Sequence, residues 1–148
     1  MQPNEERFAR FSFAIDKVAK NLQKYKNEQL EKFGLRSMHL MYLISLGRTP
    51  DGMTATELAQ NCSVDKAFIS RLTGDLCNAG YVEYKSKKAT KYNNKLILTE
   101  SGQKITKEIQ RIIDESVAHI IGDIPETHLT IFYHVLNQIA EHLEAVPV

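Results

Sequence analysis

The sequence predicts a mainly α-helical protein with one small β-hairpin, an α+β fold class. Apolar residues recur at alternating spacings of three and four near both ends of the chain, and shorter apolar helical segments lie between them. A short segment of alternating apolar and polar residues and a short apolar segment flank a lysine-rich loop, which predicts the hairpin. Together these features indicate one helical domain that carries a two-stranded wing.

Composition limits the class of protein. The chain has 148 residues, of which 43% are hydrophobic and 25% charged, enough for one domain with a single core. Its polar, acidic start lacks the features of a secretory signal, and no apolar stretch is long enough to cross a membrane. Two cysteines, Cys62 and Cys77, make no disulfide framework and lack metal-ligand spacing. We therefore expect a cytoplasmic protein with no membrane partner.

The charge is unevenly distributed along the chain. In total, 19 Lys and Arg residues against 18 Asp and Glu residues give a formal net charge of +1, which by itself counts against a nucleic-acid partner. Residues 54–99 nevertheless contain seven basic and four acidic residues, whereas residues 123–148 contain four acidic residues and no Lys or Arg. The basic middle of the chain is therefore a candidate surface for a polyanion, and the acidic end is expected to lie away from it.

The first segment, from about Asn4 to Phe33, is predicted to be a helix that ends at Gly34. Its apolar residues follow a narrow seam, which is typical of coiled-coil packing. This seam consists of Phe8, Phe11, Ile15, Val18, Leu22 and Tyr25.

A similar seam lies over residues 129–146, in a helix whose first turn holds Pro125. Another apolar helix, opened by Thr99 and Glu100, precedes it. Each seam alone is compatible with an intrachain bundle, but two seams and a third apolar helix favour a homodimer. We expect residues 1–34 and 104–146 to supply the dimerisation helices. The expected dimerisation residues are Phe8, Phe11, Ile15, Val18, Leu129, Phe132, Leu136, Ile139 and Leu143.

The middle of the chain predicts shorter elements. Residues 36–47 form an apolar helix. Thr54 and Glu57 have the spacing of a capping box, which opens a brief helix. Asp65 is the expected N-cap of a longer helix over residues 66–79.

An alternating segment, 81–85, and an apolar segment, 96–98, follow as the strands of the hairpin. Helix, short turn, helix and hairpin in this order are typical of a winged helix-turn-helix, which we assign to residues 35–102. Its two central helices can cross closely only if small or apolar residues lie at fixed offsets. These offsets are filled by Leu58, Ala59, Cys62, Val64, Ile69 and Leu72. Ser63 departs from the pattern, since this turn often holds Gly.

The outer face of the second central helix and the hairpin loop predict a double-stranded DNA partner. Short or cationic side chains on the helix suit entry into a major groove, although a solvated face would look similar. The loop from Lys85 to Lys95 contains five lysines and no acidic residue, which suits contact with a phosphate backbone or minor groove. The expected DNA-binding residues are Thr54, Thr56, Asp65, Lys66, Ala67, Ser70, Arg71, Thr73, Lys85, Lys87, Lys88, Lys91 and Lys95.

The layout resembles the MarR family of bacterial transcriptional regulators over essentially the whole chain, residues 1–148, as one domain. The resemblance is carried by Leu35–Leu43, Thr54–Gly80, Tyr81–Glu83 and Leu96–Gly102. It implies a homodimer joined through its terminal helices, with each subunit presenting a winged helix to a palindromic operator. It also implies repression that a small molecule or an oxidant relieves.

The hairpin loop departs from the family pattern. The family's wing usually carries an Asp-x-Arg or Asp-Arg-Arg element whose Arg enters the minor groove, whereas the matching stretch here is Lys91-Tyr92-Asn93. Lys88, Lys91 or Lys95 can supply charge, but lysine lacks the rigid planar fork of arginine. We therefore expect a wing that contacts mainly phosphates.

The resemblance also implies a site for a small aromatic or lipophilic anion, in a cleft between the terminal helices and the winged unit. The candidate lining residues are Phe13, Lys17, Met38, His39, Tyr42 and Arg71. Thiol sensing is not expected, because both cysteines fit packing positions and the first helix, where the family's peroxide-sensing branch places its reactive Cys, has none. We expect no metal and no cofactor, because no two histidines are spaced four residues apart on one helix. His39 does lie where a metal-responsive branch has a ligand.

Two other functions are compatible with the sequence. A winged helix can serve protein–protein assembly alone, although such modules tend to lose the basic wing and polar helix face kept here. A metal-responsive regulator of the same fold is the other alternative. No Gly-rich phosphate loop, nucleophile–base grouping or metal constellation indicates an enzyme. We expect a dimeric, sequence-specific DNA-binding regulator, namely a repressor released by a small molecule.

Overall fold

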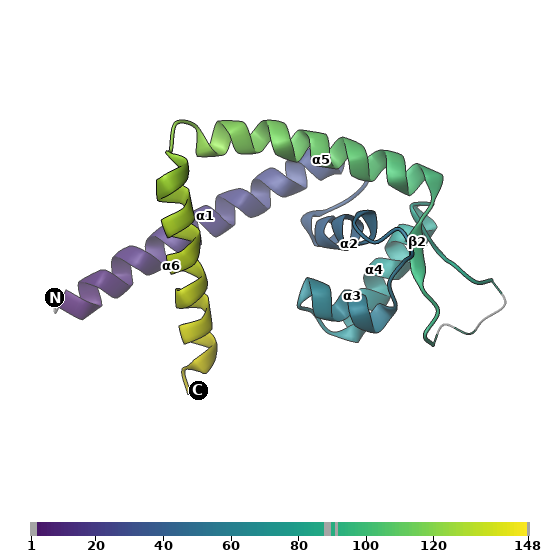
Figure 1. Cartoon of the computed structure of the whole chain (residues 1–148), viewed down its shortest axis with the longest axis horizontal. Coiled ribbons are helices and arrows are strands. Elements are labelled where there is room, and N and C mark those ends of the chain that lie inside the picture. Colours follow the sequence, from purple (N-terminus) through teal and green to yellow (C-terminus); the bar gives the residue numbers. More distant parts are fainter. Residues whose placement is uncertain (1–2, 88–89, 91, 148) are drawn as a thin grey trace. The chain divides into compact units, whose positions relative to one another are not determined.

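The computed structural model describes residues 3–87, 90 and 92–147. These residues form helices and one two-stranded antiparallel sheet (Figure 1), so the predicted fold class is confirmed. The elements are α1 (Pro3–Glu31), α2 (Ser37–Gly47), α3 (Ala55–Cys62), α4 (Lys66–Asn78), β1 (Val82–Tyr84), β2 (Leu96–Leu98), α5 (Glu100–Ile121) and α6 (Glu126–Ala145).

The chain divides into two compact units, Met1–Ile112 and Ile113–Val148. The first unit contains α1 to α4, the hairpin and the first half of α5. The second contains the rest of α5 and α6. Among the described residues, no helix combines the length and apolar character that a membrane span requires.

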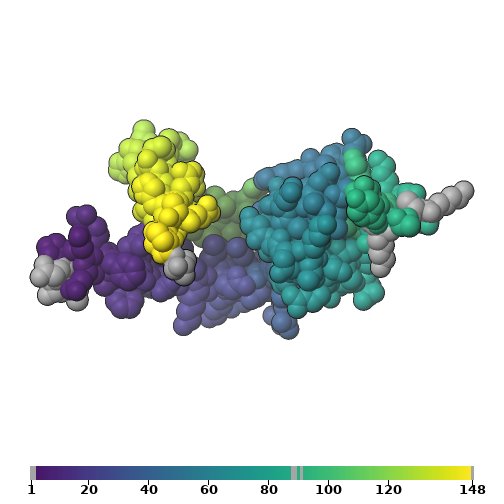
Figure 2. Space-filling model, turned by 90° about the horizontal axis from the view of Figure 1, so that it is seen from below, coloured from purple at the N-terminus to yellow at the C-terminus, as the bar shows by residue number. Residues whose placement is uncertain are grey.

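The core of the first unit lies where α2, α3, α4 and β2 meet. Tyr42 and Leu43 of α2 are fully buried there, together with Leu58 of α3 and Leu96 of β2. The predicted inward residues of α4, Ile69 and Leu72, are also buried. Figure 2 shows α2 to α4 as one continuous mass with the hairpin on its flank. The apolar residues at the helix-turn-helix offsets therefore pack in the core, as the sequence predicts.

The hairpin is fastened to the loop that precedes α3. Val82 pairs with Leu98 and Tyr84 with Leu96, and an isolated bridge pairs Leu96 with Met53. Strand β1 is shorter than predicted, because it spans Val82–Tyr84 and the sequence predicts a strand over 81–85. Lys85 still donates its backbone N–H to Lys95 O at 2.8 Å, so the paired backbone continues for one step beyond the strand.

Helix α1 ends two residues earlier than predicted. The amides of Phe33 and Leu35 both donate to Leu30 O, and Gly34 adopts a positive φ of 70°. These turn bonds satisfy carbonyl groups at the helix end, and the left-handed residue that closes such a turn is usually glycine. The chain therefore leaves the helix before Phe33.

The start of α5 is fixed on the segment that leads into β1. Thr99 Oγ1 accepts a hydrogen bond from Gly102 N–H at 3.0 Å and donates to Gly80 O at 2.6 Å. A Cβ at Gly102 would lie 2.0 Å from Tyr81 O. Only glycine therefore allows this close approach of helix and backbone.

The terminal helices expose much of their apolar surface within the single chain. On α1, Phe8 is 70% exposed and Val18 61% exposed. On α6, Leu129 is buried, Leu136 and Ile139 are half-buried, and Phe132 and Leu143 are exposed. These are seam positions of the two predicted helices.

Candidate nucleic-acid interface

Local capping bonds set the directions of α3 and α4. Glu57 N–H donates to Thr54 Oγ1 and Thr54 N–H to Glu57 Oε2, both at 3.2 Å, which is the predicted capping box. Phe68 N–H donates to Asp65 Oδ1 at 2.7 Å, so Asp65 caps α4 as predicted. Between the helices, Ser63 adopts the left-handed conformation with φ 55° and ψ 44°. The sequence flagged this position because the turn usually holds Gly.

The outer face of α4 carries an exposed cation held in place by an aromatic ring. Lys66, Ala67, Ser70 and Arg71 are all exposed, as predicted. The guanidinium carbon of Arg71 lies 5.2 Å from the ring centroid of Phe68. This cation–π contact restricts the long arginine side chain before it meets any partner. Sequence reasoning missed Phe68, although an aromatic residue three positions before an arginine on a helix is a readable signal.

Thr73 does not lie on this outer face, and the prediction that it does is wrong. Thr73 is only 7% exposed, and its Oγ1 lies 2.7 Å from Tyr42 Oη. The reason is the packing of α2 against α4, which covers this side of the helix. Gly74, the next residue, is exposed.

Of the two threonines predicted to contact DNA at the start of α3, one caps the helix and the other is exposed. Thr54 is half-buried, and its hydroxyl serves the capping box. Thr56 is exposed in the first turn of α3, where backbone N–H groups and the helix dipole favour a phosphate.

The wing lysines are only partly described. Lys85 Nζ donates to Asp51 O at 3.3 Å, which ties the base of the wing to the loop before α3. Lys87 and Lys95 are exposed. The predicted contacts Lys88 and Lys91 lie outside the described residues. Asn94, which the sequence did not single out, bridges the loop ends, accepting from Ser86 N–H at 3.2 Å and donating to Ser86 O at 2.7 Å.

Comparison with known proteins identifies this arrangement. Residues 33–90 match the sequence model described as the MarR family. The MarR family transcription regulator SP03579 superposes with a TM-score of 0.83 at 18% identity, covering 96% of this chain and 93% of that one. The chain has the MarR fold. The resemblance predicted from the sequence is therefore confirmed.

Two further solved structures with the MarR fold show bound molecules. MepR of S. aureus, in complex with DNA, superposes with a TM-score of 0.80 at 18% identity, covering 90% of this chain and 97% of that one. CouR of Rhodococcus jostii RHA1, bound to p-coumaroyl-CoA, superposes with a TM-score of 0.76 at 21% identity, covering 88% and 91%. No curated protein matches the chain.

The ligand-lining residues expected within this MarR fold are not brought together. Met38 and His39 line one surface hollow beside Asp75. Phe13 is largely exposed on α1, as is Lys17. Arg71 lies on the outer face of α4.

Tyr42, another residue expected to line the ligand cleft, is fully buried. Its hydroxyl is engaged with Thr73 in the contact between α2 and α4. Burial raises the pKa of the Tyr42 phenol, and the bond to Thr73 opposes this only in part. The phenol therefore belongs to the core of the MarR fold.

His39 is also committed to internal contacts. Its Nδ1 accepts from Arg36 N–H at 3.0 Å, so Nε2 carries the proton that it shares with Asp75 Oδ2, also at 3.0 Å. The His39 side chain is 7% exposed. His39 thus caps α2 and ties it to α4. Among the described residues, no group of three or more His, Cys, Asp or Glu side chains could hold a metal ion.

The cysteine environments favour packing. Cys62 and Cys77 are both half-buried. Burial raises the pKa of the Cys62 thiol, and the nearby Ser45 hydroxyl opposes this with a smaller effect. A raised pKa keeps the sulfur protonated and poorly reactive at neutral pH.

Proposed function

We propose that this chain is a dimeric, sequence-specific DNA-binding transcriptional regulator that represses its target until a small molecule releases it. The observation that carries the proposal is the exposed face of α4, with Arg71 held on the Phe68 ring beside Lys66 and Ser70. The DNA complex of MepR, which has the same fold, supports the same role for this chain.

In this account α4 enters the major groove. A held guanidinium can donate two hydrogen bonds to the O6 and N7 acceptors of guanine, whereas Ala67 offers a methyl group to thymine. Lys66 lies at the N-terminus of α4, where its ammonium can meet a phosphate. We assign Arg71 the base contact and the wing lysines, Lys87 and Lys95 among them, the phosphate contacts.

The dimer is proposed from the seams of the terminal helices. Large apolar side chains that are exposed in the single chain include Phe8 and Val18 on α1 and Phe132 and Leu143 on α6. Exposed apolar side chains grouped on a helix are typical of protein interfaces, which supports the dimer. A second copy of the chain would cover it and would place two copies of α4 for a palindromic operator.

The proposal is tested by selecting genomic DNA fragments with the purified chain and sequencing those retained. We expect a shared palindrome whose half-sites are about one helical turn, or 34–36 Å, apart. Arg71→Ala should lose the selection, and Lys20→Ala, which removes an exposed cation of α1, should keep it. The mass in solution should be twice the 16.9 kDa of the chain.

Two outcomes would contradict the proposal. One is retention of no fragment at low salt, which would favour a protein–protein assembly module. The other is equal retention of all fragments by the wild-type chain, since a sequence reader must discriminate among sites.

A further inference from the structure

A row of cations runs along α1 on the side opposite its apolar seam. The row consists of Arg10, Lys17, Lys20 and Lys24, which are spaced by seven, three and four residues and therefore project from one face of the helix. Phe13 lies on the same face, and we call these five residues the basic stripe. At a rise of about 1.5 Å per residue, the stripe is about 21 Å long.

The basic stripe carries charge that the chain itself does not neutralise. All five of its residues are exposed, and Phe13 is 76% exposed. Lys24 lies 4.0 Å from Glu28 in an exposed pair, which contributes little. Among the residues that the structure describes, none of the other three cations forms an ion pair. Asp16, the one acidic residue between Arg10 and Lys24 in the sequence, does not pair with the stripe.

The fold and the proposed dimer both leave the basic stripe open. Of the described residues of α1, only Leu30 is buried, and the dimer is proposed through the seam on the opposite side of the helix. Within the first compact unit, the first half of α1 projects beyond α2, α3 and α4 in both views (Figures 1 and 2). The stripe and the outer face of α4 are therefore separate surfaces, and one can be occupied while the other is.

We propose that the basic stripe binds the phosphate backbone of a second DNA duplex while α4 holds the first, so that the protein bridges two DNA segments. Duplex DNA carries one negative charge per about 1.7 Å of its axis, which suits a straight row of cations with no acid in it. Arg10, Lys17 and Lys20 contact phosphates, and such contacts do not depend on base sequence. The bridging rests on the proposed function, because it requires that α4 bind DNA.

The composition of the basic stripe favours DNA over an anionic membrane surface. A helix that lies on a membrane buries a broad apolar face in the lipid and keeps its cations on the polar face. Phe13 is the one apolar residue of the stripe. The seam of α1 could supply such an apolar face, but it is assigned to the dimer. The stripe therefore offers charge without the apolar area that membrane binding requires.

The first test measures capture of a second duplex. The full chain is bound to an immobilised operator, unbound chain is washed away, and a labelled duplex without the operator sequence is added at about 50 mM salt. We expect capture that weakens steeply with salt. In Lys17→Gln combined with Lys20→Gln, capture should be weaker, and the slope of log affinity against log salt should be shallower by about one unit for each lost contact.

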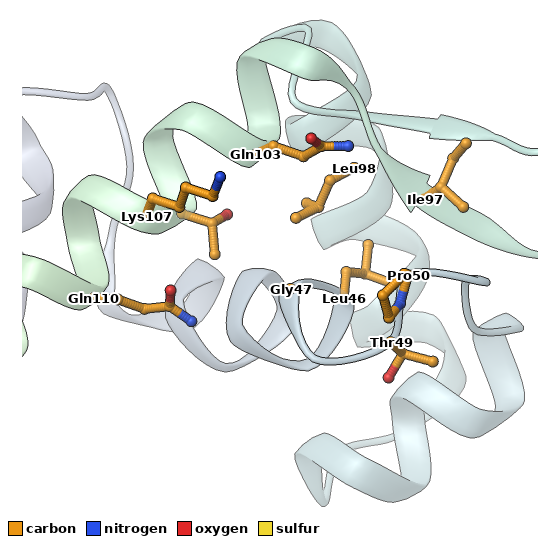
Figure 3. A pocket seen from close by; sticks show the side chains of 10 residues that line it. Leu46, Gly47, Thr49, Pro50, Ile97, Leu98, Gln103, Lys107 and Gln110 are labelled. Atoms are coloured by element: carbon orange, nitrogen blue, oxygen red, sulfur yellow. The ribbon is translucent and has the colours of Figure 1, made fainter.

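A matched double variant removes the same charge from another helix. Lys104→Gln combined with Lys107→Gln should leave capture unchanged, because both lysines belong to α5. Lys104 pairs with Glu100, and Lys107 lines a cavity of about 320 Å³ between the end of α2, β2 and α5 (Figure 3). All four substituted lysines are exposed, so both double variants should fold and should bind the operator as the wild-type chain does.

A photocrosslink reads the stripe contact without any operator. Phe13→p-benzoylphenylalanine places the reactive group within the basic stripe and should cross-link to duplex DNA at low salt. The same substitution at Phe8, a seam residue that the proposed dimer covers, is the control and should give no cross-link.

Three results would overturn the proposal. The first is no capture of a second duplex by operator-bound wild-type chain at low salt, and the second is equal capture by the stripe variant. The third is binding to vesicles of phosphatidylglycerol and phosphatidylcholine without capture or cross-linking of DNA, which would make the stripe a membrane surface. If position 13 cross-links to DNA but the chain selects no operator, the stripe contact stands, whereas the proposed function and the bridging fail.

Discussion

The phenol oxygen of Tyr42 lies 2.7 Å from the hydroxyl oxygen of Thr73, in a buried hydrogen bond that joins α2 to α4. Arg71 lies two residues before Thr73, but its side chain is exposed on the outer face of α4. One turn of α4 therefore supplies both the contact that holds the helix to the core and the cation proposed to read DNA.

Removing either hydroxyl should destabilise the protein. Tyr42→Phe leaves Thr73 Oγ1 buried without its partner, and Thr73→Val does the same to Tyr42 Oη; each should lower the free energy of unfolding by about 1–3 kcal/mol. The double variant should cost less than the sum, because no unpaired hydroxyl remains. Urea unfolding measures all three. Strictly additive costs would show that the two groups are not coupled, and a loss of DNA affinity in folded Thr73→Val would place Thr73 at the interface after all.

The same phenol predicts a loss of stability at alkaline pH. Burial raises its pKa in the folded chain above the value of about 10 expected in the unfolded chain. The unfolded state therefore loses its proton first, and the free energy of unfolding falls as pH rises above ~10, by up to about 1.4 kcal/mol per pH unit. Tyr42→Phe removes this contribution, so the stability gap between wild type and variant should narrow above that pH. A constant gap would refute the assignment.

Ser63 stores conformational strain that glycine would relieve. A non-glycine residue in the left-handed region costs about 1–2 kcal/mol, and Ser63 has φ 55°. After the entropy cost of glycine in the unfolded chain, Ser63→Gly should still raise the free energy of unfolding by about 0.5–1 kcal/mol. Ser63→Ala keeps the strain and should bring no gain. Thermal unfolding followed by circular dichroism compares them, and equal melting temperatures for Gly and Ala would contradict the account.

Two helical glycines should respond oppositely to alanine. Gly102→Ala places a methyl group 2.0 Å from Tyr81 O and should cost about 1–3 kcal/mol through overpacking. Gly74 is exposed and has nothing within 4 Å of an added Cβ, so Gly74→Ala should stabilise α4 by about 0.5–1 kcal/mol. Chemical denaturation of both variants checks the signs, and a stable Gly102→Ala would mean that α5 shifts without penalty.

Much of the winged unit could be predicted because its signals are local. The Thr54–Glu57 box and the Asp65 cap each depend on residues within three positions of one another, and both form. Leu58 and Ile69 are buried at the offsets that the close crossing of α3 and α4 requires.

What the sequence could not show depends on contacts between distant residues. Threonine occurs both in protein cores and on surfaces. Thr73 is buried because Tyr42 of α2, 31 residues earlier, packs against it. The sequence likewise does not show that Tyr42 and His39, which it predicts to line a ligand cleft, both bond to α4. The cavity beside α5 brings residues 46–50 against 97–110, a long-range pairing with no sequence motif.

The measurement that tests the central claim most directly is the affinity of the wild-type chain and of Arg71→Ala for a selected operator, each as a function of salt. We expect wild-type affinity to fall steeply with salt, as phosphate contacts require, and Arg71→Ala to lose about 1–3 kcal/mol with relaxed preference at one base pair. No complex at low salt, or a complex that Arg71→Ala leaves unaltered in affinity and specificity, would contradict the assignment of α4 as the DNA-reading helix.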